Sequence, residues 1–172
     1  QAALMAPTEI LAEQHFINIT KLLQPLEVKV SLLTGSTKSA RRRELTEDLG
    51  SGKPHVVIGT HALIQDAVKF KNLGLAVIDE QHRFGVLQRS KLMQKGLRAD
   101  VLVMTATPIP RTLALTVYGN LDLLILDEMP ALRQKITTVW RFDNKSSGIY
   151  EFIAKHVQAG EQAYIVYPLV EE

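Results

Sequence analysis

Two adjacent carboxylates, Asp79 and Glu80, directly follow the apolar run 73–78. A carboxylate at the tip of a buried strand can hold Mg²⁺, which takes one or two carboxylates and keeps several of its waters. A second carboxylate beside it can orient or deprotonate a water molecule for attack on a substrate. The plainer alternative is an acidic surface turn that caps a helix. The surroundings of the pair decide between a reaction centre and a turn.

Three further polar segments follow apolar runs in the same way: Thr34-Gly35, Gly59-Thr60 and Thr105–Thr107. In parallel α/β sheets, ligands bind beyond the carboxyl ends of the strands, so the four segments are expected to meet at one edge of one sheet. His82 would lie at this edge, within reach of a γ-phosphate or of the Thr105 and Thr107 hydroxyls. In nucleoside triphosphatases, Walker-B aspartates hold Mg²⁺ from such a position, and Asp79 fits that role.

The elements that must position these residues alternate between short apolar segments and longer amphipathic ones. Strands are predicted at 2–7, 28–35, 55–61, 73–80, 101–108 and 122–128, and helices at 8–23, 38–49, 62–65, 86–95 and 110–118. Thr8 is the expected N-cap of the first helix. The near-continuous Val, Ile and Leu strands predict an α/β fold, in which a parallel sheet carries helices on both faces.

The pattern breaks at 129–135 and resumes as a strand at 136–142, a helix at 147–158 and a strand at 162–168. We therefore expect a first domain at 1–128, a linker at 129–135 and the beginning of a second domain at 136–172, which is too short to fold alone. The chain begins within a predicted strand and stops at Glu171-Glu172 as if more should follow. A fold truncated at both ends, from a larger protein, is the expectation.

The composition is that of a globular protein, with 172 residues, 46% of them hydrophobic, and a formal net charge of +2. No apolar run is long enough to span a bilayer, and nothing at the N-terminus resembles a signal peptide. The lack of cysteine excludes disulfides and thiolate metal sites, and it fits a reducing cytoplasm. The histidines form no H-E-x-x-H pattern, so zinc is not expected. A nucleic-acid role would depend on local basic clusters, such as Lys38 with Arg41–Arg43. A solvated helix face explains the Arg41–Arg43 run equally well.

The string DEQH (79–82), together with TATPIPRT (105–112), resembles motifs II and III of superfamily 2 helicases. APTEILAEQH (6–15) resembles motif Ia, and 32–44 and 57–65 resemble the adjoining DNA-contacting segments. DEQHRFGVLQR (79–89) and 105–130 are similar to the RecG helicases in particular, and 160–172 resembles the start of their second motor domain. One departure is PALRQKI (130–136), where RecG chains usually carry a Pro-Gly-Arg turn.

The transcription-repair coupling translocases stay as an alternative, because they share HRFGV and TATPIPRT. They usually have Glu at the position of Gln81, and they depart from PTEILAEQ, so both points favour the RecG resemblance.

The resemblance implies a RecA-like motor domain of the P-loop nucleoside triphosphatase type, using ATP and Mg²⁺ to move on branched or double-stranded DNA. By resemblance, Asp79 binds Mg²⁺, Glu80 activates water, and both contact the nucleotide together with Gln81. The residues that would couple the nucleotide to DNA are His82, Thr105 and Thr107. The implied DNA contacts are Pro7, Thr8, Glu9, Thr34, Gly35, Gly59, Thr60 and Arg111. The longer protein is expected to be a cytoplasmic monomer that repairs and recombines DNA.

A P-loop, G-x-x-x-x-G-K-[ST], is missing from the sequence. The one Gly-Lys pair, Gly52-Lys53, is followed by Pro54 and then by a strand, so it is interpreted as a helix C-cap and turn. In the resembling family the P-loop precedes the first strand of this chain. We therefore expect the isolated chain to be enzymatically inert, with at most weak, non-specific DNA affinity, and to self-associate through an exposed sheet edge.

Overall fold

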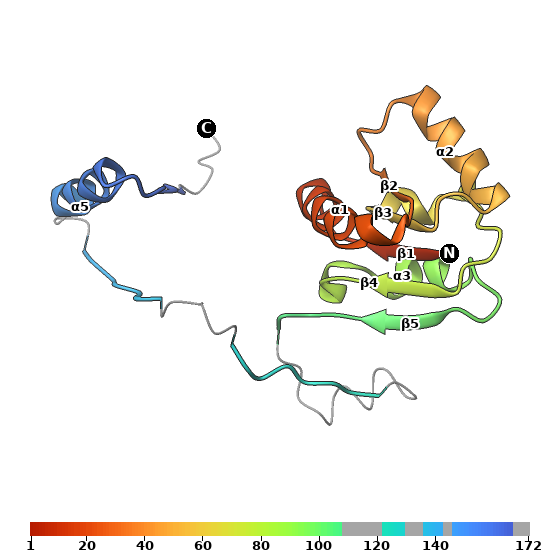
Figure 1. Cartoon of the computed structure of the whole chain (residues 1–172). Helices are drawn as coiled ribbons and strands as arrows, with labels where there is room; N and C mark the ends of the chain where they lie inside the picture. Colours follow the sequence, from red (N-terminus) through yellow and green to blue (C-terminus); the bar gives the residue numbers. More distant parts are fainter. Residues whose placement is uncertain (108–121, 130–135, 143–145, 167–172) are drawn as a thin grey trace, which may run out of the picture. The chain divides into compact units, whose positions relative to one another are not determined.

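The computed structural model describes residues 1–107, 122–129, 136–142 and 146–166. The chain divides into two compact units, Gln1–Leu123 and Leu124–Glu172, and each is described by itself (Figure 1). The predicted helix 110–118 and Arg111 lie outside the described residues. The predicted linker at 129–135 stays a prediction.

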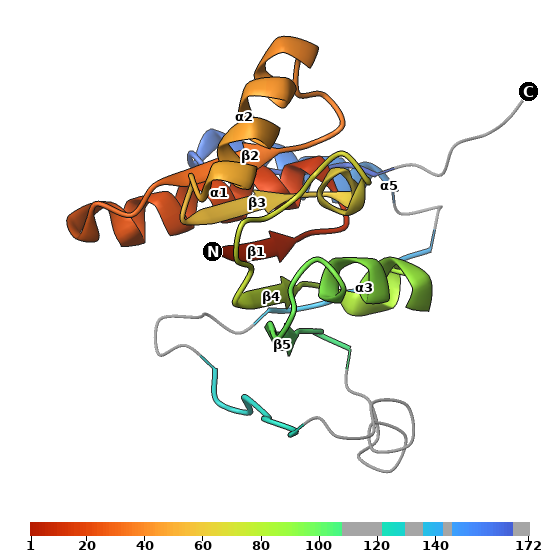
Figure 2. The ribbon, with the colours of Figure 1, turned by 90° about the vertical axis from the view of Figure 1, so that its right-hand side faces the viewer.

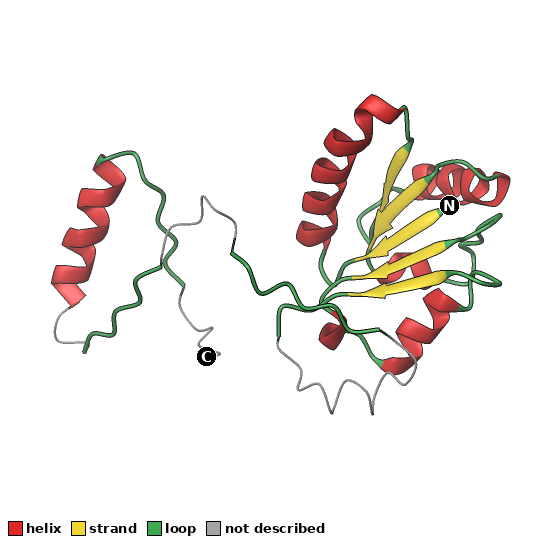
Figure 3. Ribbon diagram, turned by 60° about the horizontal axis from the view of Figure 1, so that its bottom comes forward, coloured by secondary structure: helices red, strands yellow, loops and turns green. Residues whose placement is uncertain are grey.

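The first unit is built on a five-stranded parallel sheet. Its strands are β1 (Ala2–Met5), β2 (Val30–Leu33), β3 (Val56–Gly59), β4 (Leu75–Ile78) and β5 (Asp100–Val103). Their order in the sheet is β2-β3-β1-β4-β5, which can be followed from top to bottom in Figure 2. All four pairings are parallel, and the arrows in Figure 3 point the same way. The predicted α/β fold with a parallel sheet is confirmed.

The five strands end level with one another. Met5 pairs with Gly59 and Ile78, Leu33 also pairs with Gly59, and Ile78 pairs with Val103. These five residues are the last of their strands. The segments that follow them therefore start along one edge of the sheet, as the sequence predicted.

Helices cover both faces of the sheet, because alternate strand residues point to opposite sides. On one face, α1 (Glu9–Leu23) buries Ala12 against Leu4, Ala6 and Ile58. On the other face, α2 (Ser39–Ser51) and α3 (Val86–Met93) contribute to a second apolar cluster. The members of that cluster from helices and strands include Leu45, Leu49, Leu92, Met5, Leu33, Val57 and Ile78. Three short 3₁₀ helices, η1 (Gln24–Leu26), η2 (His61–Ile64) and η3 (Gln81–Arg83), lie in the connections.

Local capping fixes two of these helices. Thr8 is the N-cap of α1, and its Oγ1 accepts a hydrogen bond from the Leu11 N–H at 3.3 Å. Gly52 ends α2 with φ +100°, a left-handed conformation that glycine adopts without steric cost. Both caps were predicted, and the Gly52 cap confirms that Gly52-Lys53 belongs to a turn after a helix.

The predicted elements of the first unit are mostly right in type and too long in extent. Three predicted strands are wrong over their described residues: the structure has no strand at 122–128, at 136–142 or at 162–166, and residues 167–168 lie outside the described residues. These runs are rich in apolar residues, but a strand also needs a neighbouring strand to accept and donate its backbone hydrogen bonds. Their large side chains stay exposed, as Leu126, Trp140 and Tyr164 show.

The described part of the second unit contains one helix, α5 (Ser146–Gln158). The ring of His156 lies 4.2 Å from that of Phe152, one turn earlier, and its Nδ1 lies 2.7 Å from Glu161 Oε2. Among the described helices of the chain, none has both the length and the apolar content to cross a membrane.

Candidate functional site

Asp79 lies at the end of β4 on the face that α1 covers. Its backbone N–H donates to the Met5 carbonyl at 2.9 Å, which continues the ladder between β1 and β4. Its Oδ1 accepts from the Glu80 N–H at 2.9 Å, and its Oδ2 lies 2.7 Å from Nε2 of His15. The Asp79 side chain is only 18% exposed. The carboxylate is therefore held within the sheet edge and does not face bulk solvent.

Glu80 has a backbone conformation that few residues other than glycine adopt, with φ 47° and ψ 51°. Such a residue costs roughly 1–2 kcal/mol and persists where the surrounding structure fixes it. The turn aims the carboxylate toward the segment after β5, where Oε2 lies 3.5 Å from the Ala106 nitrogen. Nδ1 of His82 lies 3.4 Å from the same oxygen.

The segment 105–107 is thus beside Glu80, as the sequence predicted. The Thr107 N–H donates to Oγ1 of Thr105 at 3.2 Å, which folds the segment back on itself. Met104, just before this segment, is held by two backbone hydrogen bonds. Its N–H donates to the Ile78 carbonyl at 2.8 Å, and its carbonyl accepts from the Gln81 N–H at 3.2 Å. The direct contact of His82 in the structure is with Glu80, and its predicted contact with the threonine hydroxyls stays a prediction.

A cleft of about 420 Å³ lies between Glu80 and the start of α1. Its lining residues are Pro7, Thr8, Leu11, Glu80, His82 and Arg83. Two of the predicted DNA contacts and two of the predicted catalytic residues therefore share one hollow surface. Its groups include a carboxylate, an imidazole and a guanidinium, which suit a polar or charged ligand.

The carboxylates fit a magnesium ion only if other oxygens complete its shell. Within the described residues, no group of three or more His, Asp or Glu side chains could hold a metal ion. Mg²⁺ in phosphate sites is commonly held by one or two carboxylates, with water and phosphate oxygens completing its octahedron. Asp79, with Glu80 beside it, offers that number of ligands. The chemistry of this donor set favours Mg²⁺ carried by a phosphate over an all-protein metal centre.

Glu9, in the first turn of α1, contacts the loop after β2. Its Oε1 accepts from the Ser36 N–H at 2.9 Å. Hydrogen bonds from the Ser36 side chain and backbone lower the pKa of the Glu9 carboxyl from its usual value. A Cβ placed on Gly35 would lie only 2.9 Å from this carboxylate oxygen. The glycine therefore allows a close approach, and the group that approaches in this structure is Glu9.

Thr34 and Thr60 are buried residues, 3% and 2% exposed. Oγ1 of Thr34 lies 2.9 Å from Oγ of Ser36. Oγ1 of Thr60 and Oε1 of Gln81 are buried without a hydrogen-bond partner among the described atoms. The predicted DNA contacts of the two threonines stay predictions, because almost none of either residue is exposed in this structure.

Arg42 and His15 lie at the site without having been predicted to belong to it. Arg42 donates through Nη2 to the carbonyls of Thr34 and Gly35, at 2.8 and 3.1 Å, and through Nη1 to Gln65 Oε1 at 2.9 Å. It holds the loop after β2 and is no free cation on a helix face. His15 could have been noticed, since it falls on the same helical face as the buried Ala12.

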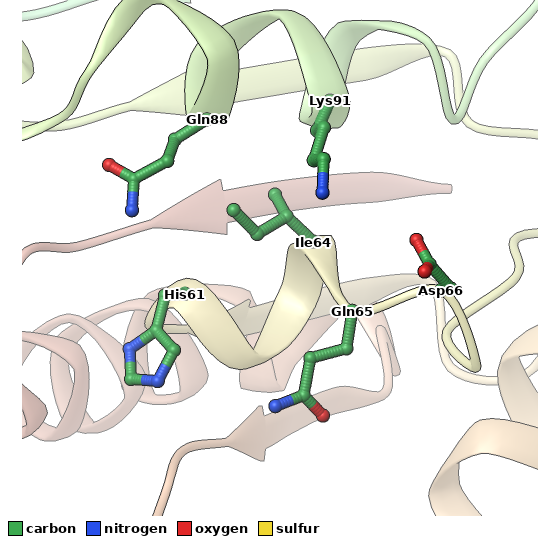
Figure 4. A pocket seen from close by; sticks show the side chains of 6 residues that line it. All are labelled: His61, Ile64, Gln65, Asp66, Gln88 and Lys91. Carbon is green, nitrogen blue, oxygen red and sulfur yellow. The ribbon is translucent and has the colours of Figure 1, made fainter.

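A second cleft, of about 430 Å³, lies between η2 and α3 and contains none of the predicted site residues. Figure 4 shows Lys91 extending from α3 toward Ile64 and Gln88 extending from the same helix on the side of His61, with Asp66 on the opposite side. Its polar groups are mostly exposed.

The DEAD/DEAH box helicase profile matches residues 1–116, and the chain belongs to this family. Among curated proteins, the chain is 55% identical over all its residues to the ATP-dependent DNA helicase RecG of Bacillus subtilis, of which it covers 25%. It is also 49% identical over all its residues to RecG of Thermotoga maritima, covering 22% of that protein. The predicted resemblance to RecG helicases is confirmed, and the chain spans about a quarter of the length of these relatives.

Solved structures also resemble the chain. A structure of RecG bound to a three-way DNA junction matches 99% of the chain with a TM-score of 0.77 and 46% identity, and the chain covers 23% of it. The yeast DEAD-box splicing factor Prp28 matches 70% of the chain with a TM-score of 0.52 and 20% identity, and the chain covers 30% of it. At that identity the second match supports the fold alone, which is the expected RecA-like motor domain.

Proposed function

We propose that this chain is the part of a RecG-type, ATP-dependent DNA helicase that activates water for ATP hydrolysis and contacts the DNA backbone. The observation that carries the proposal is the acidic pair at the level edge of the sheet. Asp79 is turned toward α1, whereas Glu80 is turned toward 105–107, so the two carboxylates have different surroundings and can have different roles. By likeness to its relatives, the longer protein would remodel branched DNA in repair and recombination.

Asp79 would hold the Mg²⁺ that accompanies ATP, and Gln81 would lie near the nucleotide. Mg²⁺ bound there would neutralise charge that develops on the transferred phosphoryl group. Glu80 would orient a water molecule and accept its proton, because its carboxylate reaches into the cleft that Thr8 and His82 also line. Nδ1 of His82 lies 3.4 Å from that carboxylate, so His82 would couple changes at the nucleotide to Thr105 and Thr107.

The DNA contacts would come from the strand ends beside this site. The start of α1 (Pro7, Thr8 and Glu9) presents helix N-terminal amides, which bind phosphate groups well. Further phosphate contacts would come from the ends of β2 and β3, at Thr34, Gly35, Gly59 and Thr60, and from Arg111. Contacts to phosphates position the protein without reading sequence, so binding would be largely sequence-independent and would weaken as salt rises.

The rest of the proposed organisation follows the RecG relatives. Residues 1–128 would belong to the first motor domain, 129–135 to a linker and 136–172 to the beginning of the second motor domain. The longer protein would act as a cytoplasmic monomer on branched or double-stranded DNA.

The test is to place this chain in the Bacillus subtilis helicase, in exchange for its 172 matching residues, and to measure ATP hydrolysis with forked DNA. The exchange should retain DNA-stimulated turnover within about an order of magnitude, since 55% of the residues are identical. Glu80→Gln should then lower turnover by roughly 100-fold or more, because a general base is lost. Turnover that is unaffected by Glu80→Gln would contradict the assignment.

We also propose that the chain by itself does not turn over ATP. Gly52-Lys53 cap the end of α2 and lead into β3, so they form no strand-to-helix phosphate loop. In phosphoryl transfer, most of the rate acceleration comes from holding the phosphates in position. Asp79 alone cannot replace a phosphate loop in that role. Hydrolysis by the purified 172 residues, abolished by Glu80→Gln, would refute this.

A further inference from the structure

His15 and Asp79 lie 64 positions apart in the sequence, yet their side chains meet at the sheet edge. The 2.7 Å distance from Nε2 to Oδ2 is that of a charge-assisted hydrogen bond. The contact links α1 to the carboxylate proposed to hold the metal ion. It is partly shielded, with 28% of the His15 side chain and 18% of the Asp79 side chain exposed.

The alternation of side chains along β4 and the helical spacing along α1 bring the two residues together. Ile78 points into the cluster beneath α2 and α3, so the next residue, Asp79, points to the opposite face, toward α1. His15 lies three residues after Ala12, which α1 buries against that face. Residues three or four apart share a helix face, so the imidazole is directed to the sheet.

We propose that His15 is a positioning residue for the metal-binding carboxylate: its imidazole donates to Oδ2 of Asp79 and holds the side chain in the orientation that Mg²⁺ requires. The inference rests on the proposed function, because it takes Asp79 as a metal ligand. Each carboxylate oxygen has more than one acceptor site, so the bond from His15 orients the group and leaves lone pairs for the ion.

The geometry supports positioning over packing alone. The Glu80 N–H holds the other oxygen of Asp79 at 2.9 Å, so both oxygens have a fixed donor and the carboxylate cannot rotate freely. Partners that hydrogen-bond a metal ligand typically change metal affinity by 10–100-fold when they are removed. Imidazole is a poor ligand for Mg²⁺ and Mn²⁺ compared with carboxylate and water, so His15 is assigned to the second sphere of the ion.

The test uses the Bacillus subtilis helicase that carries this chain in exchange for its matching residues, with ADP present to supply phosphate oxygens. Mn²⁺ is the probe, and its binding is followed by paramagnetic broadening of the amide NMR signals of residues 79–81. The informative variants are His15→Leu and His15→Gln, which both fill space while only glutamine can donate. Gln14→Leu is the matched control, because Gln14 is the exposed neighbour on the same helix. Melting temperatures show whether each variant is folded.

His15→Leu should raise the Mn²⁺ concentration at half-broadening by about tenfold or more, and His15→Gln should recover most of that loss. Gln14→Leu should leave the concentration unchanged, and excess Mg²⁺ should reverse the broadening. Equal behaviour of the leucine and glutamine variants, or tighter binding by His15→Leu, would overturn the positioning role. Asp79→Asn separates the two proposals, since broadening that survives it would contradict the metal site itself.

Discussion

The carboxylate of Glu9 accepts a hydrogen bond from the backbone N–H of Ser36 at 2.9 Å, across 27 positions of the sequence. This bond ties the start of α1, which follows β1, to the loop that follows β2. The loop can approach this closely because position 35 is a glycine. A Cβ added at this position would lie only 2.9 Å from the same carboxylate oxygen. Two of the proposed DNA-contacting segments are thus fixed to each other by their own side chains.

Glu9→Gln should lower the stability of the first unit at neutral pH and change its pH dependence. The pKa of the Glu9 carboxyl is lowered by hydrogen bonds from the Ser36 side chain and backbone. The ionised carboxyl therefore stabilises the fold above its ordinary pKa, and this contribution is lost as pH falls through the lower folded value.

Thermal unfolding of Glu9→Gln and wild type between pH 7 and pH 3 measures this effect. The difference in melting temperature should be largest near pH 7 and should shrink as the pH falls below the usual range for glutamate. Glu13→Gln, at an exposed carboxylate of the same helix, serves as the control and should show little difference at any pH. A difference for Glu9→Gln that grows toward acid pH would contradict the assignment.

Gly59→Ala should destabilise the protein by about 3 kcal/mol or more, because the added Cβ would fall on the backbone carbonyl of Leu33 in the neighbouring strand. Gly50→Ala is the matched control, since nothing lies within 4 Å of its Cβ and it belongs to α2. Alanine is the better helix former by about 0.5–1 kcal/mol, so Gly50→Ala should be stabilising. Urea denaturation measures both, and equal effects would contradict the close approach.

Arg42→Ala should cost about 1–3 kcal/mol of unfolding free energy, because it leaves the carbonyls of Thr34 and Gly35 without their charged donor. Arg41→Ala removes a cation from the same helix but breaks only an exposed pair with Glu44, at 2.8 Å, so its cost should be below about 1 kcal/mol. Chemical denaturation of the two variants compares these costs. Equal losses of unfolding free energy in the two variants would contradict the role of Arg42 in holding the loop after β2.

The sequence was sufficient to predict the parallel sheet and the gathering of polar residues at its edge. Strand and helix periodicities are local, and the apolar runs before Asp79, Thr34 and Thr60 are near-continuous. The same patterns failed at 122–128, 136–142 and 162–168, where the described residues form no strand. An apolar run predicts an extended segment, but only the rest of the fold decides whether a neighbouring strand is there to pair with it.

The partners of the site residues could not be predicted, because they depend on which helix face meets which strand end. His15 with Asp79, Glu9 with Ser36 and Arg42 with the loop after β2 are long-range contacts. The sequence left Arg41–Arg43 undecided between DNA contacts and a solvated helix face, and the structure gives Arg42 a third role. Charge runs show where cations are but not which of them are already bound within the protein.

Asp79 is proposed to bind the Mg²⁺ that accompanies ATP, and Asp79→Cys in the exchanged Bacillus subtilis helicase tests this role most directly. A thiolate prefers soft ions and binds Mg²⁺ poorly, so a metal ligand changed in this way should change the preferred metal. Turnover with Mg²⁺ should fall by about 100-fold and should recover at least about tenfold with Cd²⁺, whereas Glu13→Cys should show neither effect. Turnover that persists with Mg²⁺, or that no other ion restores, would contradict this role.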